Sequence, residues 1–290
     1  MRAKDDYFTT TRFALKAQSI PFASSGRCLG KAARRPMRVH VNGGHVGCLF
    51  DLLNELLREL QRIESDPAAR VVIITGTGGI FCSGGNIVKM VSQGKSMVPP
   101  EPTIREQLYP HEADIRAVIV GLRRLAKPTI AAVNGHAVGS GLGIAVGCDV
   151  RFAVRGAKLG WVFTRRGLVP DDGSLYFMPQ IVGYARAFEW GITGRTITPE
   201  EGERIGFISA VLEPAELLPR CRSFAKEIIE NVPPTTAQAF KLALTEAMER
   251  NLEGALAFGE RAQQIASSTA DHTEALRAYA ERRPPHWHDT

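Results

Sequence analysis

The stretch Lys127-Pro-Thr-Ile-Ala-Ala-Val-Asn-Gly-His-Ala-Val-Gly-Ser-Gly-Leu-Gly-Ile144 joins an apolar run, a glycine-rich turn and an apolar segment with helical spacing. A second stretch has the same order, with Arg70-Val-Val-Ile-Ile-Thr-Gly76 before the turn Phe81-Cys-Ser-Gly-Gly-Asn86. The β-branched runs favour strands. A strand, a glycine turn and a helix N-terminus together aim bare backbone N–H groups at an anion. Two such turns predict an oxyanion hole to which each contributes one donor.

Alternating strand and helix patterns surround these turns. An apolar stripe from Leu52 to Ile63 predicts a helix, and strands are expected at 71–75 and 150–154. This alternation is typical of an α/β fold with a parallel sheet. Beyond Gly194 the pattern is mainly helical, with no strand expected after Leu212 and helices expected at 199–205, 214–229, 235–250 and 252–280.

Three regions are expected along the 290 residues. Residues 1–50 form an atypical basic segment of low order with one strand at 7–15 and a short strand at 39–41. Residues 51–212 form the α/β core, and residues 213–290 form a helical C-terminal region. The net charge is +6, but it becomes −1 without the seven basic residues between 7 and 50. We therefore expect no nucleic-acid partner, because the basic charge is confined to one segment.

The five cysteines are scattered and lack CxxC spacing, which favours a reduced, cytoplasmic location. The most apolar stretch, from Thr129 to Val150, contains Asn134, His136 and Asp149 and five glycines. It is therefore not expected to cross a membrane. No metal site is expected.

Five collinear blocks make the chain resemble the crotonase family, the enoyl-CoA hydratase/isomerase superfamily. They are the two turns, Cys148-Asp-Val-Arg151, Gly167-Leu-Val-Pro-Asp-Asp-Gly173 and Ile192-Thr-Gly-Arg-Thr-Ile-Thr-Pro-Glu-Glu201. The resemblance spans about residues 51–290. It implies a spiral of ββα units with a helical C-terminal region that assembles as a homotrimer or hexamer. It also implies an acyl-CoA thioester as ligand, with no cofactor besides the coenzyme A of the substrate.

The resemblance places the two oxyanion N–H groups on Gly85 and Ser140. Ser140 stands where the family usually has glycine, and its backbone N–H is retained. A serine nucleophile at Ser140 is the alternative, but nothing in the sequence marks a histidine as its base, and His136 is interpreted as a packed or hydrogen-bonded loop residue. A tolerated small residue is the favoured interpretation of Ser140. The substrate-binding residues implied are Ser83, Gly85, Asn86, Ile87, Gly139, Ser140, Phe163 and Pro170.

The acid/base residues depart from the family's hydratases, whose two glutamates fall on Gly143 and Phe163 here. Neither residue can move a proton. By resemblance to dienoyl-CoA isomerases, Asp171 is the predicted acid/base group, with Asp172 as a weaker candidate. The alternative is that Pro170-Asp-Asp-Gly173 is a turn whose aspartates are solvated or capping.

Other residues have structural alternatives. Lys241 is a candidate CoA contact or a surface lysine, Arg165 and Arg166 are CoA-phosphate contacts or a solvated pair, and Trp287 covers a neighbouring subunit's pocket or anchors the tail. The predicted function is an acyl-CoA enzyme that stabilises a thioester enolate, with isomerisation favoured over two-glutamate hydration. The alternative is a catalytically impaired relative that binds acyl-CoA or a partner protein without turnover.

Overall fold

The computed structural model describes residues 17–19, 35–41, 49–85 and 115–288. Its central sheet has the strand order β1-β2-β3-β5-β7-β10. The strands are β1 (Ala17–Ser19), β2 (Arg35–Val41), β3 (Ala69–Gly76), β5 (Thr129–Val133), β7 (Val150–Val154) and β10 (Ala210–Leu212). All neighbours run parallel except β1 and β2, which are antiparallel. The predicted α/β class with a parallel sheet is confirmed.

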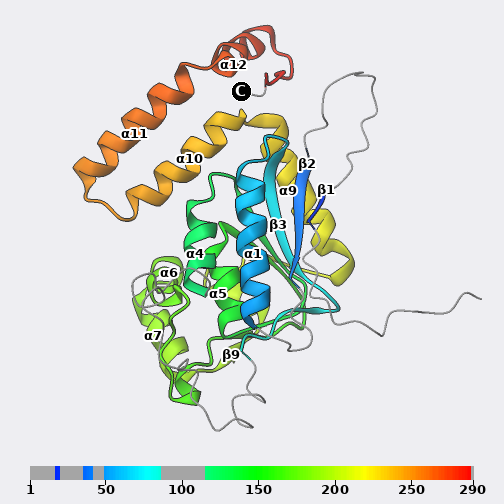
Figure 1. Ribbon diagram of the computed structural model, residues 1–290, viewed down its shortest axis with the longest axis vertical. Coiled ribbons are helices and arrows are strands. Elements are labelled where there is room, and N and C mark those ends of the chain that lie inside the picture. The colour runs from blue at the N-terminus through cyan, green and yellow to red at the C-terminus, as the bar shows by residue number, and fades with distance from the viewer. Residues whose placement is uncertain (1–16, 20–34, 42–48, 86–114, 289–290) are drawn as a thin grey trace, which may run out of the picture.

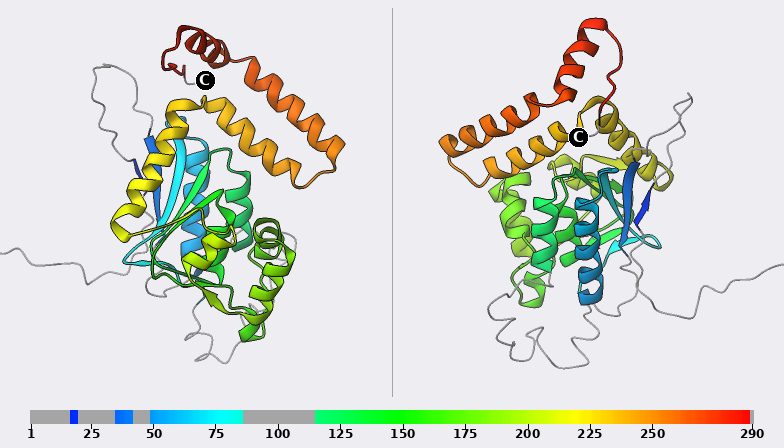
Figure 2. Two further views of the ribbon diagram at one scale, coloured as in Figure 1. Left: turned by 180° about the vertical axis from the view of Figure 1, so that it is seen from behind. Right: turned by 45° about the horizontal axis from the view of Figure 1, so that its top comes forward.

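Helices cover both faces of this sheet (Figures 1 and 2). Val72 and Ile74 of β3 pack toward α1 (Leu49–Glu64), α4 (Ile115–Arg124) and α5 (Ser140–Gly147). Val71 and Ile73 pack on the other face against α9 (Pro214–Asn231). Burial on both faces explains why β3 and β5 are continuous apolar runs rather than alternating ones.

A smaller second sheet has the order β4-β6-β8-β9. It consists of β4 (Ile80–Cys82), β6 (His136–Val138), β8 (Leu159–Gly160) and β9 (Thr196–Ile197). β4, β6 and β8 run parallel, whereas β9 is antiparallel to β8. A 3-10 helix η1 (Thr164–Arg166) and the helices α6 (Ser174–Val182), α7 (Tyr184–Thr193) and α8 (Pro199–Arg204) complete this part.

The helical C-terminal region begins at α9 and ends in an arm of three helices. The arm consists of α10 (Pro234–Ala247), α11 (Leu252–Ser267) and α12 (Ala270–Glu281), and α10 and α11 lie side by side away from the sheet (Figures 1 and 2). The single helix expected at 252–280 is wrong. The chain breaks at Ser268, and the Thr269 hydroxyl caps α12 by accepting the His272 N–H at 3.2 Å.

The N-terminal segment also differs from the expectation. The strand predicted at 7–15 lies outside the described residues, and the strand predicted at 39–41 extends over all of β2. β1 and β2 belong to the same sheet as β3, so strands from the expected N-terminal segment extend the core sheet. α9 also packs on the sheet. The expected boundary at 212 therefore falls between β10 and α9, and the arm begins only after α9.

Candidate active site

The two predicted glycine turns lie in direct contact. They follow the parallel strands β4 and β6, which pair with each other. A β-carbon on Gly84 would lie 2.5 Å from the Val138 carbonyl oxygen and 3.3 Å from the Ser140 nitrogen. A β-carbon on Gly141 would lie 2.1 Å from the Cys82 carbonyl oxygen. Only glycine allows this approach, so the two turns require each other's small residues.

Backbone N–H groups at the N-terminus of α5 lie beside the first turn. Its N-cap, Gly139, has φ 56° and ψ −129° and makes no side-chain cap. The Gly139 carbonyl accepts the N–H groups of Leu142 at 2.8 Å and Gly143 at 3.2 Å. Ser140 is the first helical residue, a position whose N–H has no acceptor within a helix. The Ser140 N–H and the helix dipole therefore favour negative charge at this point.

The predicted substrate-binding residues come from both turns and from the segment between β8 and α6. Gly85 directly follows Gly84, so it lies in the turn that contacts the Ser140 nitrogen. Asn86 and Ile87 lie outside the described residues. Ser83 is exposed, Gly85 and Phe163 are half-buried, and Pro170 is buried.

The two neighbouring aspartates occupy opposite environments. Asp171 is exposed, whereas Asp172 is fully buried. Asp172 Oδ1 accepts the Ser174 N–H at 3.2 Å and the Ser174 hydroxyl at 2.5 Å. The Trp161 indole N–H donates to the same hydroxyl oxygen at 2.8 Å. Asp172 Oδ2 is buried without a hydrogen-bond partner among the described residues. The predicted turn therefore accounts for the contacts of Asp172 Oδ1, which caps Ser174, but not for the buried Oδ2.

The unpaired oxygen of Asp172 lies against Gly143, in the first turn of α5. A β-carbon on Gly143 would lie 2.5 Å from Asp172 Oδ2 and 2.7 Å from its Cγ. Burial raises the pKa of Asp172, an effect that the two hydrogen bonds from Ser174 oppose and that the charge of Asp171 adds to. A carboxylate therefore lies beside the residue that replaces one family glutamate.

Comparison with known proteins decides the family. The family model described as enoyl-CoA hydratase/isomerase matches residues 49–290. The chain belongs to the enoyl-CoA hydratase/isomerase family. It is 33% identical over 242 residues to methylglutaconyl-CoA hydratase of Rattus norvegicus, covering 82% of this chain and 73% of that one. It is 32% identical over 210 residues to 4-chlorobenzoyl coenzyme A dehalogenase-2 of Arthrobacter sp, covering 72% and 73%. Sequence identity alone therefore does not select between these two chemistries.

The crystal structure of enoyl-CoA hydratase from Bacillus anthracis superposes with a TM-score of 0.78 at 27% identity. The superposition covers 90% of this chain and 98% of that one. The crotonase fold expected from the sequence is thereby confirmed for this member of the enoyl-CoA hydratase/isomerase family.

In this enoyl-CoA hydratase/isomerase family member, His136 is not placed to assist Ser140 as a nucleophile. The His136 side chain is exposed, and its Nδ1 accepts the Lys158 backbone N–H at 3.0 Å. Among the described residues, no side chain is hydrogen-bonded to the Ser140 hydroxyl. The arrangement favours the interpretation of Ser140 as a small residue at a tight helix start.

Three further candidates have structural roles within the chain. Lys241 is buried and bonds Asp149 Oδ2 at 2.9 Å and the carbonyls of Leu122 and Lys127, so the expectation of a surface lysine is wrong. Arg165 donates to the Thr193 carbonyl at 2.7 Å. Trp287 is buried and donates its indole N–H to the Glu230 carbonyl of α9 at 3.0 Å, so it anchors the tail in its own chain.

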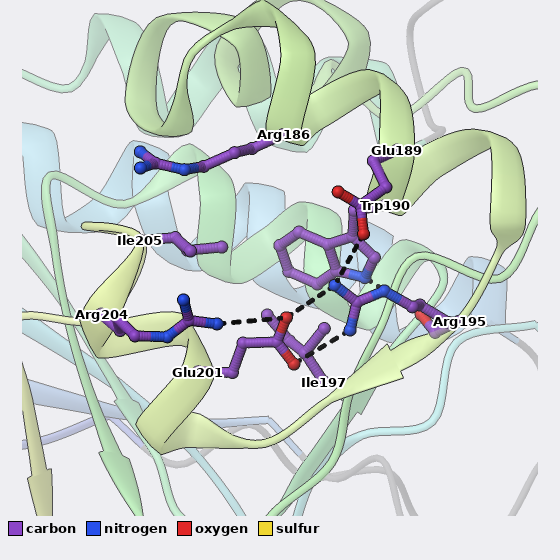
Figure 3. A pocket seen from close by; sticks show the side chains of 8 residues that line it. All are labelled: Arg186, Glu189, Trp190, Arg195, Ile197, Glu201, Arg204 and Ile205. Carbon is purple, nitrogen blue, oxygen red and sulfur yellow. Dashed lines mark hydrogen bonds and ion pairs between the residues drawn. The ribbon is translucent and has the colours of Figure 1, made fainter.

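A surface pocket lies at a different place, between α7, β9 and α8 (Figure 3). Its charged side chains mostly bind one another. Arg195 pairs with Glu201 at 2.6 Å and with Glu189 at 3.4 Å, and Arg204 lies 4.0 Å from Glu201. None of the predicted site residues lines this pocket. We therefore assign it no part in the candidate active site.

Within the described ranges, no group of three or more His, Cys, Asp or Glu side chains could hold a metal ion. The same ranges contain no helix long and apolar enough to cross a bilayer.

Sequence reasoning did not predict the burial of Asp172, because it depends on α5 and Trp161, which lie outside its own segment. A usable signal was present in the sequence. Glycine stands at 143, where the resemblance implies a glutamate, and a second acidic residue follows Asp171. The missing carboxylate at position 143 and the additional one at Asp172 indicate that the two side chains would compete for the same volume.

Proposed function

We propose that this chain is an acyl-CoA enzyme that stabilises a thioester enolate with the N–H groups of Gly85 and Ser140. The contact between the two glycine turns carries this proposal. Gly84 approaches the Ser140 nitrogen, and the N–H of Ser140, the first residue of α5, has no backbone acceptor among the described residues. Preorganised donors of this kind stabilise negative charge where it develops in a transition state.

Double-bond isomerisation fits these residues better than two-glutamate hydration. Hydration requires groups that activate water, and the two hydratase positions hold Gly143 and Phe163. Isomerisation of a 3-enoyl thioester requires only that one proton leaves C2 and one arrives at C4, while the double bond moves from C3–C4 to C2–C3. A single carboxyl group beside the oxyanion hole can perform both transfers.

The Asp171-Asp172 segment supplies the carboxylates for this step. Asp171 is the residue favoured by resemblance, and its exposure leaves it open to solvent and to a ligand. Asp171 and Asp172 are therefore the two candidates for this group, and turnover of 3-enoyl-CoA by Asp171→Asn and by Asp172→Asn separates them.

Turnover and binding assays test the proposed function. Wild-type protein is incubated with straight-chain 3-enoyl-, dienoyl- and 2-enoyl-CoAs, and binding of a saturated acyl-CoA is titrated calorimetrically. We expect isomerisation of 3-enoyl-CoA to exceed hydration of 2-enoyl-CoA. Binding without turnover of any substrate would favour the impaired relative, and absence of both would contradict the acyl-CoA assignment.

Two substitutions of Ser140 distinguish the contribution of its backbone N–H from that of its hydroxyl. Proline is tolerated at the first position of a helix, and it lacks the N–H. Ser140→Pro is therefore expected to lower turnover about 100- to 1,000-fold, the typical effect of losing one oxyanion donor. The matched control Ser140→Ala keeps the N–H and is expected to stay within a few-fold of wild type. Loss of activity in Ser140→Ala would instead support a serine nucleophile.

We propose a homotrimer or hexamer as the working assembly. The arm exposes Phe240, Leu252, Leu256 and Tyr279 with 64–86% of their surface accessible. Large apolar side chains left exposed along one arm are expected to pack against another protein surface. Sedimentation of wild type against Leu252→Ser/Leu256→Ser tests this, with dissociation expected in the variant and an unchanged monomeric wild type as the contradicting result.

A cytoplasmic location is supported by the three described cysteines, Cys82, Cys148 and Cys221, which are free and buried. Burial raises the pKa of Cys148 and of Cys221 to about 12, so these thiols are unreactive core side chains. Such thiols need no oxidising compartment.

A further inference from the structure

The buried carboxylate of Asp172 has one satisfied oxygen and one unsatisfied oxygen. Ser174 holds Oδ1 with its N–H and its hydroxyl, and Trp161 in turn holds that hydroxyl. Oδ2 has no partner among the described residues, although the whole residue is 0% exposed. An unpaired buried polar atom is costly, so a carboxyl oxygen left in this state calls for an explanation in function.

The free oxygen points at the helix that carries the proposed oxyanion donor. Gly143, which Asp172 Oδ2 contacts, lies three residues after Ser140 in α5. Residues three apart in a helix lie on one face, about 4.5 Å apart along the axis. The Asp172 carboxyl group is therefore held about one helical turn from the Ser140 N–H.

The space that Asp172 fills is the space that a side chain at position 143 would need. A β-carbon there would lie only 2.5 Å from Oδ2 and 2.9 Å from the Asp172 β-carbon. Glycine at 143 and aspartate at 172 are thus sterically coupled. The chain has a carboxylate at this point of the site, but it comes from the α6 N-terminus instead of from α5.

We propose that Asp172, rather than its exposed neighbour Asp171, is the acid/base group that moves the proton between C2 and C4 of the acyl thioester. This inference rests on the proposed function. Asp172 Oδ2 takes the C2 proton as the C2–H bond breaks and the enolate forms. The same O–H bond then breaks as the C4–H bond forms, so no atom or electron is gained or lost overall.

The surroundings of Asp172 suit both states of such a shuttle. The Ser174 N–H and hydroxyl stabilise the carboxylate before it accepts the proton. Burial stabilises the neutral acid while it holds the proton, because a low-dielectric environment disfavours charge. The Trp161–Ser174 link keeps Oδ1 occupied and leaves Oδ2 as the oxygen that exchanges the proton.

The difference in burial predicts whether the proton taken from C2 exchanges with solvent, and this distinguishes Asp172 from Asp171 as the acid/base group. A proton held by Asp172 is closed off from solvent, whereas a proton held by exposed Asp171 exchanges with water quickly. The test uses 3-enoyl-CoA deuterated at C2, with wild-type protein in ordinary water. We expect most product molecules to carry the deuterium at C4, and product without deuterium at C4 would overturn the inference.

Two matched variants complete the experiment. Asp172→Asn keeps the shape and the hydrogen bonds to Ser174, and it is expected to lower the isomerisation rate about 100- to 10,000-fold without loss of acyl-CoA binding. Asp171→Asn is expected to change the rate less than about 10-fold and to leave deuterium retention unchanged. Full activity in Asp172→Asn, or loss confined to Asp171→Asn, would overturn the inference while leaving the proposed function intact.

A rescue variant guards against misfolding of Asp172→Asn. Asp172→Gly empties the space beside position 143, so Gly143→Glu in that background can return a carboxylate to the site. We expect the double variant to regain at least about 10-fold activity over Asp172→Gly alone, and no gain would contradict the inference. A wild-type protein that binds acyl-CoA but isomerises none of the substrates would refute the proposed function and the inference together.

Discussion

Helices α5 and α11 both contain apolar residues, but they differ in how far those residues are buried within the chain. All eight residues of α5 are buried, whereas none of the sixteen residues of α11 is buried. α5 is enclosed by the sheet, by α4 and by α6 of its own chain. α11 contacts α10 and α12 and leaves Leu252, Leu256 and Ile265 exposed. The candidate site is therefore built inside one chain, and the arm presents its apolar residues outward.

The difference explains where substitutions are tolerated. Close backbone approach around α5 leaves no room for added atoms, because protein interiors are packed at crystal density. The arm is joined to this body through few buried polar contacts, of which Lys241 to Asp149 is one.

Breaking the joint between arm and body is expected to have the largest effect on stability. Lys241→Met removes the buried ammonium that binds Asp149 and two carbonyls. It leaves the partly buried Asp149 carboxylate without its cationic partner, with Thr129 still donating two hydrogen bonds to it. We expect a loss of about 3 kcal/mol in the free energy of unfolding, measured by urea denaturation. The control Glu246→Gln breaks an exposed pair between Glu246 of α10 and Arg250 just beyond that helix, and it is expected to cost about 0.3–0.5 kcal/mol. Equal losses of unfolding free energy in the two variants would contradict a stabilising role for the buried contact between Lys241 and Asp149.

Adding one methyl group to each of the two helices tests their packing directly. Gly141→Ala places a β-carbon 2.1 Å from the Cys82 carbonyl oxygen, so we expect a loss of about 1–3 kcal/mol or more. Gly259→Ala in α11 meets no atom within 4 Å and is expected to gain up to about 1 kcal/mol from helix propensity. Thermal denaturation of both variants measures the contrast, and a stable Gly141→Ala protein would refute the contact between the turns.

The pH dependence of Asp172→Asn stability tests the burial of the carboxylate. Burial raises the pKa of Asp172 above its unfolded value of 3.8, so the folded state binds the proton more tightly. Stability that involves Asp172 is therefore present at low pH and falls as pH rises from the unfolded pKa through the folded one. We expect the Tm advantage of Asp172→Asn to grow with pH across this window. A Tm difference that does not change with pH would contradict it.

The smallest effect is expected at the end of the arm. The Glu274 carboxylate accepts hydrogen bonds from Arg283 at 2.6 Å and from the His286 N–H at 2.8 Å, and these lower the pKa of Glu274 to about 2. Its contribution is present above about pH 4.5 and is lost as pH falls toward 2. Glu274→Gln is expected to speed hydrogen exchange at the His286 N–H with little change in global Tm. A large drop in global Tm would show that the arm and body unfold together.

Features encoded by local sequence were predictable. The glycine turns, the β3 and β5 runs and the start of the helical region at 214 follow from residue type and spacing over a few positions. The break between α11 and α12 was missed because no glycine or proline marks Ser268. The pairing of β2 with β3 was missed because parallel pairing joins segments that are distant in sequence.

Features set by packing were not predictable from the sequence. A lysine at position 241 is expected on the surface from sequence alone. In the structure, α10 lies against the end of α4, and the Lys241 ammonium donates hydrogen bonds to the carbonyls of Leu122 and Lys127. Asp171 and Asp172 are chemically identical, and only α5 and Trp161 distinguish them by burying one. The resemblance to dienoyl-CoA isomerases favours Asp171, and it carries no information on the burial of Asp172.

A crystal structure with a non-reactive acyl-CoA analogue shows directly whether the two glycine turns form an oxyanion hole. We expect the thioester oxygen to accept both the Gly85 and the Ser140 N–H groups at 2.7–3.2 Å, with the α-carbon on the side of Gly143 and Asp172. A thioester oxygen bound by neither N–H group, or an acyl chain bound away from the two glycine turns, would contradict it.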